Sequence, residues 1–237
     1  MKPFLFNEVF AVNPNLAISN APLASVPAVV VDSFLKDPAQ ARAVVGSAPA
    51  ANWKHVEGGR NFVDYYDCRL RFPVWFPNHM IDVAHQIVRK VYATVTRPQD
   101  PGVDVNWFMQ IGEKRAQFAF PHADTAPNVK RSFTCIVYLN GPDECSGGTA
   151  FFRFKPSKSL VLDAPYQRAL QHEPGLVESG RDYWMENAAA YWEMVGAIDM
   201  VPGRLLVFPS EYYHAAYHPA DSFFRFPRLT LAFWMIC

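Results

Sequence analysis

The segment Phe-Pro-His-Ala-Asp-Thr at residues 120–125 holds the side chains best suited to chemistry, because His122 and Asp124 stand two positions apart. On an extended strand, residues i and i+2 point to the same face with their Cα atoms about 7 Å apart. An imidazole nitrogen and a carboxylate oxygen placed in this way can both reach one metal ion, at about 2.0–2.2 Å each. The pair therefore predicts two ligands of a metal site.

The spacing alone is a weak signal. With 22 acidic residues among 237, about one histidine in ten has an acid two positions later by chance. His55 and Glu57 show the same pattern, and we interpret that pair as such a coincidence. A metal site at His122 and Asp124 therefore depends on a third ligand from another part of the chain.

Two later histidines are candidates for that ligand. His214 lies 92 residues after His122 and follows the strand-like segment 204–210, and His218 comes four residues later. On a strand the two would be about 13 Å apart, so they cannot both bind one ion. We favour His214 for its spacing from Phe208-Pro-Ser and keep His218 as the alternative. Two histidines and one carboxylate on one face of an octahedral ion leave three positions open, which suits non-haem Fe(II).

An arginine near the C-terminus adds a charge that needs a partner. Arg228 opens the strand-like segment Arg-Leu-Thr-Leu-Ala-Phe-Trp. Alternation puts three further side chains on the face of Arg228, namely Thr230, Ala232 and Trp234. A guanidinium that faces inward among apolar side chains is costly unless it meets an anion. A dicarboxylate co-substrate would supply that anion through a bidentate contact.

Most of the segments that carry these residues are predicted to be short strands. A strand is predicted for 27–34, a helix begins at Asp37-Pro38 and stops at Gly46, and a second helix begins at Asn78. From about residue 103 short strands follow, interrupted at 155–196, where a helix is predicted around Tyr183–Val195. The predicted strands are 104–111, 115–120, 131–139, 148–154, 197–201, 204–208, 214–218 and 228–234. The fold class is therefore mainly β with N-terminal helices (α+β), as a β-rich barrel or sandwich.

The composition limits the classes of function. A chain of 237 residues that is 50% hydrophobic can bury one sizeable core, and 22 basic against 22 acidic residues give zero formal charge. That balance argues against a general nucleic-acid binder and a polybasic membrane anchor. The N-terminus is a poor signal peptide, no apolar run reaches ~18 residues, and the four cysteines show no CxxC spacing. We expect a soluble, cytoplasmic protein without a nucleic-acid or membrane partner.

Five features in order resemble the Fe(II)/2-oxoglutarate-dependent oxygenases, prolyl-hydroxylase-like branch. They are His122-Ala-Asp124, Arg131-Ser-Phe-Thr-Cys-Ile-Val-Tyr138-Leu-Asn, Ser146-Gly-Gly-Thr, Phe208-Pro-Ser with His214, and Arg228 with Trp234. The resemblance implies a double-stranded β-helix, a jelly roll whose mouth carries the metal. No linker divides the chain, so we expect a single oxygenase domain over 1–237. Its parts are an N-terminal strand and helical support at 1–102 and a jelly-roll core at 103–237 with an insertion at 155–196.

The resemblance also implies roles for residues. Fe(II) would be held by His122, Asp124 and His214. Arg228 would bind the distal carboxylate of 2-oxoglutarate, with a second hydrogen bond from Tyr138, and Arg131 would face the substrate. The implied activity is a dioxygenase that uses 2-oxoglutarate and dioxygen to hydroxylate a C–H bond of an amino acid, a peptide or protein side chain, or a small metabolite. Halogenating relatives replace the carboxylate ligand, so the presence of Asp124 favours hydroxylation.

Two departures from the family and several alternatives stay open. The 14 residues between His214 and Arg228 exceed the ~10 of the family, a spacing that His218 would fit. The insertion at 155–196 would lie near the mouth and could form a lid. Tyr138 has the alternative role of a core aromatic, and Arg131 that of a surface or salt-bridge residue. A non-catalytic jelly-roll module that binds a metal or ligand is the alternative function, and a metal enzyme without redox chemistry is a third.

Overall fold

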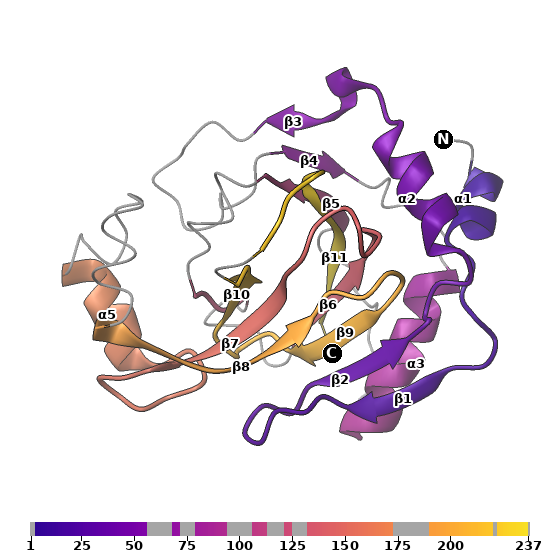
Figure 1. The fold of residues 1–237 in the computed structure, drawn as a ribbon. Coiled ribbons are helices and arrows are strands. Elements are labelled where there is room, and N and C mark those ends of the chain that lie inside the picture. Colours follow the sequence, from indigo (N-terminus) through magenta and orange to yellow (C-terminus); the bar gives the residue numbers. More distant parts are fainter. Residues whose placement is uncertain are drawn as a thin grey trace.

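The computed structural model describes residues 3–55, 68–71, 79–93, 106–112, 121–124, 132–172, 190–219 and 222–236. Within these ranges the chain forms two antiparallel sheets (Figure 1). The large sheet contains, in spatial order, β1 (Ala17–Asn20), β2 (Val29–Asp32), β9 (Leu205–Pro209), β6 (Ser132–Tyr138), β11 (Arg228–Ile236), β5 (Asn106–Ile111), β4 (Cys68–Arg71) and β3 (Lys54–His55). The small sheet contains β10 (His214–Tyr217), β7 (Gly148–Phe154) and β8 (Trp192–Asp199).

The connections between the two sheets define the fold. His122 forms an antiparallel bridge with His214, so the segment 121–124 extends the small sheet beyond β10. From β5 onward the chain alternates between the sheets. Strands β5, β6, β9 and β11 lie in the large sheet. Between them the chain passes through the small sheet, first as the segment 121–124, then as β7 and β8, and finally as β10. This path winds two sheets of four core strands around each other, which is a double-stranded β-helix, a form of jelly roll. The predicted fold class is therefore confirmed.

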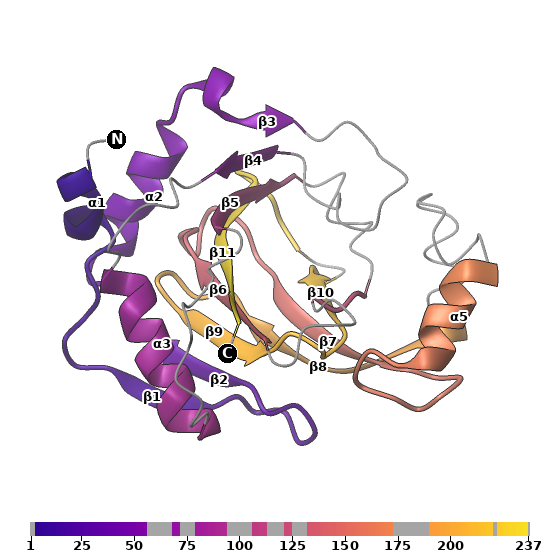
Figure 2. The ribbon, with the colours of Figure 1, turned by 180° about the vertical axis from the view of Figure 1, so that it is seen from behind.

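Helices cover one face of the large sheet. They are α1 (Pro3–Val9), α2 (Pro38–Gly46) and α3 (His79–Tyr92), and they lie on the side of the molecule opposite α5 (Ala164–His172), as Figures 1 and 2 show. A short 3-10 helix, η1 (Ala50–Asn52), follows α2. Apolar side chains of α1, α2 and α3 share one core with the helix-facing side chains of β2, β5, β6, β9 and β11. The large sheet therefore has one face against helices and the other toward the small sheet.

Alternation along the strands decides which side chains enter the space between the sheets. In β11 the odd-numbered residues, such as Leu229 and Leu231, belong to the core beneath the helices. In β6 the odd-numbered Cys135 does the same, whereas Ile136 and Tyr138 pack between the two sheets. The period of two that places consecutive side chains on opposite faces therefore turns Arg228 and its even-numbered neighbours inward.

The two predicted N-terminal helices form close to their predicted bounds. In α2 the Asp37 carboxylate accepts a hydrogen bond from the Gln40 amide at 2.9 Å, Pro38 stands in the first turn, and Gly46 is the last helical residue. An aspartate cap followed by proline satisfies the free amides of a helix start, and this explains why the sequence signal was correct. Helix α3 begins at His79, one residue after the predicted start at Asn78.

One predicted helix was partly wrong. The helix expected around Tyr183–Val195 falls partly on 173–189, outside the described residues, but its last residues lie in strand β8, which begins at Trp192. Trp192 pairs with Phe154 of β7, and its ring packs 4.9 Å from that of Tyr213. Strand pairing and ring packing thus outweigh the local helical spacing. The predicted strand 115–120 also lies outside the described residues, and the sequence did not predict α1, α5, β1, β3 or β4.

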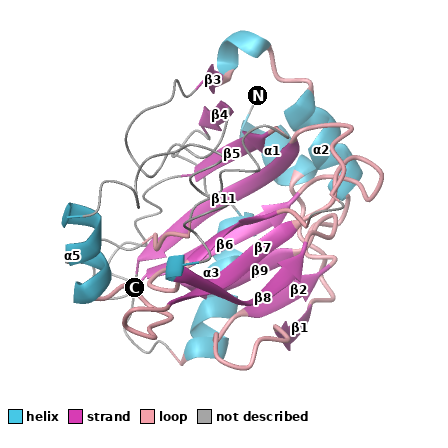
Figure 3. Ribbon diagram, turned by 60° about the vertical axis from the view of Figure 1, so that its left-hand side comes forward, coloured by secondary structure: helices cyan, strands magenta, loops and turns pink. Residues whose placement is uncertain are grey.

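Strands make up most of the regular structure that is described (Figure 3). The other predicted strands are all present, and β7 has the predicted bounds Gly148–Phe154. Among the described helices, none combines the length and the apolar character that a membrane-spanning helix requires.

Candidate metal centre and the adjoining cavity

Backbone pairing brings the two halves of the candidate metal centre together. The amide of His122 donates to the carbonyl of His214 at 2.9 Å, and the amide of His214 donates to the carbonyl of His122 at the same distance. The amide of Asp124 donates to the carbonyl of Ser210, also at 2.9 Å. The segment 121–124 therefore lies between β10 and the end of β9, where two residues 92 positions apart in the sequence become neighbours.

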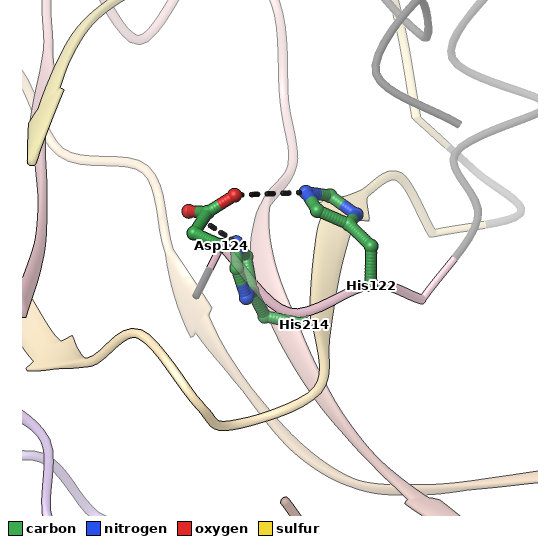
Figure 4. A group of neighbouring side chains, drawn as sticks. All are labelled: His122, Asp124 and His214. Atoms are coloured by element: carbon green, nitrogen blue, oxygen red, sulfur yellow. Dashed lines mark ion pairs between the residues drawn. The ribbon is translucent and has the colours of Figure 1, made fainter. Parts of the chain in front are cut away.

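The side chains of His122, Asp124 and His214 converge from these segments (Figure 4). One nitrogen of each imidazole and one carboxylate oxygen lie within 4.8 Å of one another. Nε2 of His214 is 3.2 Å from Oδ2 of Asp124, and Nε2 of His122 is 3.5 Å from Oδ1. The structure thus brings together the three residues that the sequence proposed as ligands, and His218 is not part of this group.

His214 is oriented by its surroundings. Its Nδ1 lies 3.0 Å from the carbonyl oxygen of Tyr212, which can only accept, so Nδ1 carries a proton and Nε2 is the nitrogen that faces Asp124. The ring of Phe208 packs edge-on at 4.7 Å, and the imidazole is almost fully buried. A second hydrogen bond of this type commonly fixes the tautomer of a metal-binding histidine.

Asp124 is held by neighbours that favour its ionised form. The Thr134 hydroxyl donates to Oδ2 at 2.8 Å and lies 2.9 Å from the Ser210 hydroxyl. Burial by itself raises the pKa of Asp124, but the His214 and His122 imidazoles and the hydrogen bonds from His214 and Trp234 hold it well below its usual range. The carboxylate is therefore charged at neutral pH, as a metal ligand must be.

A cavity extends from this group between the two sheets. It encloses about 340 Å³, with the open solvent at its mouth included. Its lining residues come from β5, β6, β7, β10, β11 and the 121–124 segment, namely Met109, Asp124, Thr134, Ile136, Thr149, His214, Ala215, Ala216, Arg228, Thr230, Ala232 and Trp234. The walls are mostly apolar, and polar side chains gather toward Asp124 and around Arg228.

The second polar group of the cavity surrounds Arg228, which is 3% exposed. Its Nη2 donates to the carbonyl of Gly148 at 3.1 Å, and its guanidinium carbon lies 5.6 Å from the ring centre of Tyr138. The Tyr138 hydroxyl pairs with the Thr149 hydroxyl at 2.7 Å. Burial raises the pKa of Tyr138, although Arg228 opposes that shift, so the hydroxyl stays protonated and able to donate.

Two buried polar atoms on the side chains that line the cavity around Arg228 have no partner among the described residues. They are Nε of Arg228 and the hydroxyl oxygen of Thr230. No carboxylate in the described part of the chain forms an ion pair with Arg228. A buried guanidinium without an anion and a buried hydroxyl without a partner are both costly, and one anionic ligand in the cavity would satisfy both.

Two consecutive glycines allow the strands around Arg228 to approach closely. A Cβ atom on Gly148 would meet the carbonyl of Ile198, and one on Gly147 would meet the carbonyl of Tyr217 and the His218 ring. Gly147 also has a φ of +135°, which side chains disfavour. The Gly-Gly pair therefore lets β7 lie tightly between β8 and β10, and this presents the Gly148 carbonyl to Arg228.

His218 lies at the Arg228 end of β10. Its Nδ1 is 3.3 Å from the carbonyl of Ser146, and its ring packs 4.7 Å from that of Phe224. Burial and then the charge of Arg228 lower the pKa of His218 to about 3. His218 is therefore a neutral, partly buried imidazole away from the metal group. Arg131, the predicted substrate contact, lies outside the described residues.

The long spacing between His214 and Arg228 has a structural explanation. Residues 222–227 dock on the turn at 141–146: the amides of Arg225 and Phe226 donate to the carbonyl of Glu144 at 2.8 and 3.0 Å, and the amide of Ser146 donates to Phe223 at 3.1 Å. The extra residues thus lie against this turn, and the chain that follows them brings Arg228 to the same cavity as His214.

Sequence reasoning assigned no role to four hydroxyl residues near the two polar groups. They are Thr134, Thr149, Ser210 and Thr230. Alternation had placed Thr230 on the inward face, and the same rule puts Thr134 on the face of Tyr138. The signal was thus present for two of them, but hydrogen-bond partners on other strands depend on the packing of the sheets.

The described part of the insertion supports the metal group from outside the cavity. Tyr166 of α5 packs 4.9 Å from the ring of Tyr213, next to His214, and its hydroxyl lies 3.4 Å from the carbonyl of Pro121, next to His122. Phe154, Trp192 and the small Ala123 belong to the same cluster. These contacts connect α5 to both segments that carry the candidate ligands.

Comparison with known proteins adds a family. A model described as "Family of unknown function (DUF6445)" matches residues 13–230. The chain belongs to this family. The matched range contains the three converging residues at the metal group and also Arg228 and Thr230. No curated protein matches the sequence.

Several solved structures resemble the chain. One is a Pseudomonas putida prolyl-4-hydroxylase, with 14% identity and a TM-score of 0.45, covering 90% of this chain and 94% of that one. Another is EvdMO1, with 13% identity and a TM-score of 0.45, covering 88% of this chain and 47% of that one. A prolyl 4-hydroxylase from Phytophthora capsici has 14% identity and a TM-score of 0.43, covering 88% of this chain and 58% of that one. The chain thus spans about half the length of the second and third. Likeness at this level does not transfer an activity, so the function has to be inferred from the residues of this chain.

Proposed function

We propose that the protein is an Fe(II)- and 2-oxoglutarate-dependent dioxygenase that hydroxylates a C–H bond of an amino acid, a peptide or protein side chain, or a small metabolite. One observation carries this proposal. A single cavity is lined at one position by Asp124 and His214, which form a two-histidine, one-carboxylate group with His122, and at another by a buried arginine without an anionic partner among the described residues. The first group suits a metal, and the second suits a carboxylate.

The metal group fits Fe(II) by the chemistry of its donors. His122 and His214 would bind through imidazole nitrogens and Asp124 through its ionised carboxylate, which leaves room for other ligands around the ion. Thr134 and the carbonyl of Tyr212 hold Asp124 and His214 in place. Fixed orientation of this kind raises the affinity of a site for its metal.

The Arg228 end fits the distal carboxylate of a dicarboxylate. Arg228 can offer its unpaired Nε, and Thr230 its unpaired hydroxyl. The protonated hydroxyl pair of Tyr138 and Thr149 lies beside them and can supply a further donor. These charged and neutral donors would fix one end of 2-oxoglutarate and so direct its 2-oxo acid end toward the metal group.

The bound iron, together with 2-oxoglutarate and dioxygen, supplies the oxidising chemistry, in which 2-oxoglutarate is decarboxylated to succinate and a substrate C–H bond is hydroxylated. The residues of the chain bind and orient. Asp124 stays charged through its hydrogen bonds, His214 turns its Nε2 toward the metal position, and apolar residues such as Met109 and Ile136 limit water in the cavity. We also propose that Arg131 contacts the substrate.

An anaerobic titration tests the proposal. Adding 2-oxoglutarate to Fe(II)-loaded protein should produce the visible metal-to-ligand charge-transfer band of a chelated 2-oxo acid, and Asp124→Ala should abolish it. The His218→Gln variant is the matched control, because it replaces a nearby, partly buried histidine outside the metal group, and it should keep the band. Admitting air should then form succinate.

The opposite results would identify the alternatives. Folded, iron-loaded protein without a band would contradict the dioxygenase and favour a non-catalytic binding module. Equal turnover of a substrate with zinc, independent of dioxygen, would indicate a metal enzyme without redox chemistry.

A further inference from the structure

Arg228 occupies a position where strand pairing is complete on one side only. It is the first residue of β11 and pairs with Ile111 of β5, but the pairing of β11 with β6 begins only at Thr230 and Tyr138. Backbone near the end of a strand frays unless other groups hold it. The chain before Arg228 belongs to the docked loop 222–227 rather than to a sheet. On the side of β6, groups outside the strand ladder must therefore hold the backbone around Arg228.

The side chain of Asn140 does so from both sides. Its Oδ1 accepts a hydrogen bond from the amide of Leu229, just after Arg228. Its Nδ2 donates to the carbonyl of Pro227, just before Arg228, at 3.1 Å. Asn140 is 1% exposed and lies two residues beyond Tyr138. One carboxamide thus holds the peptide groups on both sides of the arginine.

The orientation of that carboxamide is determined by its partners. The carbonyl of Pro227 and the Glu144 carboxylate can only accept, and Nδ2 of Asn140 faces both, at 3.1 and 3.0 Å. The amide of Leu229 can only donate, and Oδ1 faces it. Because all three roles are fixed, an asparagine fits this position and an aspartate does not.

Glu144 connects this arrangement to the N-terminal helices. Its Oε2 accepts from Asn140, from the amide of Gly141 at 3.1 Å, and from Nε of Arg42 in α2 at 2.9 Å. Arg42 in turn lies over the Phe226 ring, 5.8 Å from its centre. The carboxylate therefore anchors the Asn140 side chain to a helix outside the jelly roll.

We propose that Asn140, oriented by Glu144, is a positioning residue for Arg228 and thereby sets the affinity of the cavity for the distal carboxylate of its dicarboxylate ligand. Asn140 itself does not line the cavity and acts through the backbone on either side of Arg228. This inference rests on the proposed binding of 2-oxoglutarate.

The test uses anaerobic Fe(II)-loaded protein and measures the Kd of 2-oxoglutarate. Asn140→Leu removes all three hydrogen bonds at nearly constant volume, and it should raise the Kd at least about tenfold while the Fe(II) affinity stays within about twofold. Glu144→Ala, at a partly exposed position that the fold tolerates better, should raise the Kd by about threefold. Val88→Ala, in the buried core of α3, is the control for general destabilisation and should leave the Kd unchanged.

A double-mutant cycle distinguishes positioning from a general structural role. In an Arg228→Ala background, Asn140→Leu should have no further effect on the Kd, because the group that Asn140 positions is gone. An equal increase of the Kd with and without Arg228 would overturn the proposal. So would an unchanged Kd in the folded Asn140→Leu single variant.

A second readout keeps the inference testable if the proposed function fails. Amide hydrogen exchange of Leu229 in ligand-free protein should accelerate in Asn140→Leu, while exchange in β9 stays as in the parent protein. Parent protein that binds no 2-oxoglutarate would refute the proposed function, and accelerated exchange at Leu229 would still support the role of Asn140 in holding Arg228. Unchanged exchange at Leu229 would refute the role of Asn140.

Discussion

The two polar groups in the cavity are built in opposite ways. At the metal group, Oδ2 of Asp124 accepts from Thr134, Thr134 also meets Ser210, and Nδ1 of His214 pairs with a backbone carbonyl. Among the side chains that line the cavity around Arg228, two buried polar atoms lack a partner within the part of the chain that is described, namely Nε of Arg228 and Oγ1 of Thr230. The metal group is thus supported by the protein, whereas the Arg228 group is incomplete without a ligand.

This difference indicates where the free energy of folding and the free energy of binding conflict. A buried polar atom that has no partner costs about 1–3 kcal/mol, and that cost is recovered when a ligand supplies the partner. Substitutions at the Arg228 group should therefore weaken ligand binding with little harm to the fold. Substitutions around Asp124 should harm metal binding and stability together. The following predictions test this contrast.

The largest effect is expected at the metal group. Asp124→Ala removes the only anionic donor of the group and should lower the affinity for Fe(II) by more than about a hundredfold, since loss of mere supporting partners already costs 10–100-fold. Equilibrium dialysis with metal analysis measures this. His218→Gln should bind iron like the parent protein, and iron loss in His218→Gln alone would reverse the assignment of the third ligand.

At the Arg228 group we expect an effect on the ligand and none on the metal. Arg228→Ala removes the charged donor and should raise the Kd of 2-oxoglutarate by about a hundredfold, or ~3 kcal/mol, with Fe(II) affinity unchanged. Calorimetric titration under anaerobic conditions measures both constants. If Arg228→Ala lost iron as strongly as Asp124→Ala, the two groups would not be separate.

His218 should make the Arg228 end sensitive to acid. Its pKa is about 3 in the folded protein, below the ~6.5 of an unfolded chain, so between these values the unfolded state binds the additional proton. Stability from the neutral His218 is present above pH ~6.5 and is lost as the pH falls. From pH 7 to pH 5 the parent protein should lose about 2 kcal/mol more than His218→Gln. Urea unfolding at both pH values measures this, and equal losses would contradict it.

The smallest effect provides the most direct comparison, because one substitution can be made in both groups. Thr230→Val removes an unpaired hydroxyl and should stabilise the ligand-free protein by up to about 1 kcal/mol while weakening 2-oxoglutarate binding. Thr134→Val removes a hydroxyl that pairs with Asp124 and should destabilise the protein by about 1 kcal/mol or more. Chemical denaturation measures both changes. Effects of the same sign would refute the contrast between the two groups.

Much of the fold could be predicted because its signals are local. Asp37-Pro38 marks a helix start through hydrogen bonds within four residues, and alternation in β6 and β11 assigns each side chain to a face without knowledge of the partner strand. Trp192 shows where local signals fail. Its helical spacing was outweighed by strand pairing with Phe154 and by packing against the rings of Tyr166 and Tyr213.

The same distinction between local signals and tertiary contacts applies to the candidate site. His122, Asp124, His214 and Arg228 could be proposed from residue type and spacing, because a strand places residues i and i+2 on one face whatever it pairs with. The position of residues 222–227 could not be predicted, since it depends on hydrogen bonds to the turn at 141–146, which is distant in the sequence. Nor could the role of Asn140, whose three partners come from two different segments.

Which side chains face inward, and which of them can bind a metal or an anion, follows from the amino-acid sequence alone, because covalent geometry and strand periodicity are properties of the local chain. Which of these groups are paired follows only from the three-dimensional fold. Thr134 and Thr230 are the same residue type on inward faces of neighbouring strands, yet one is paired with Asp124 and the other is left without a partner among the described residues. That difference depends on segments that are distant in the sequence and come into contact only when the two sheets pack against each other.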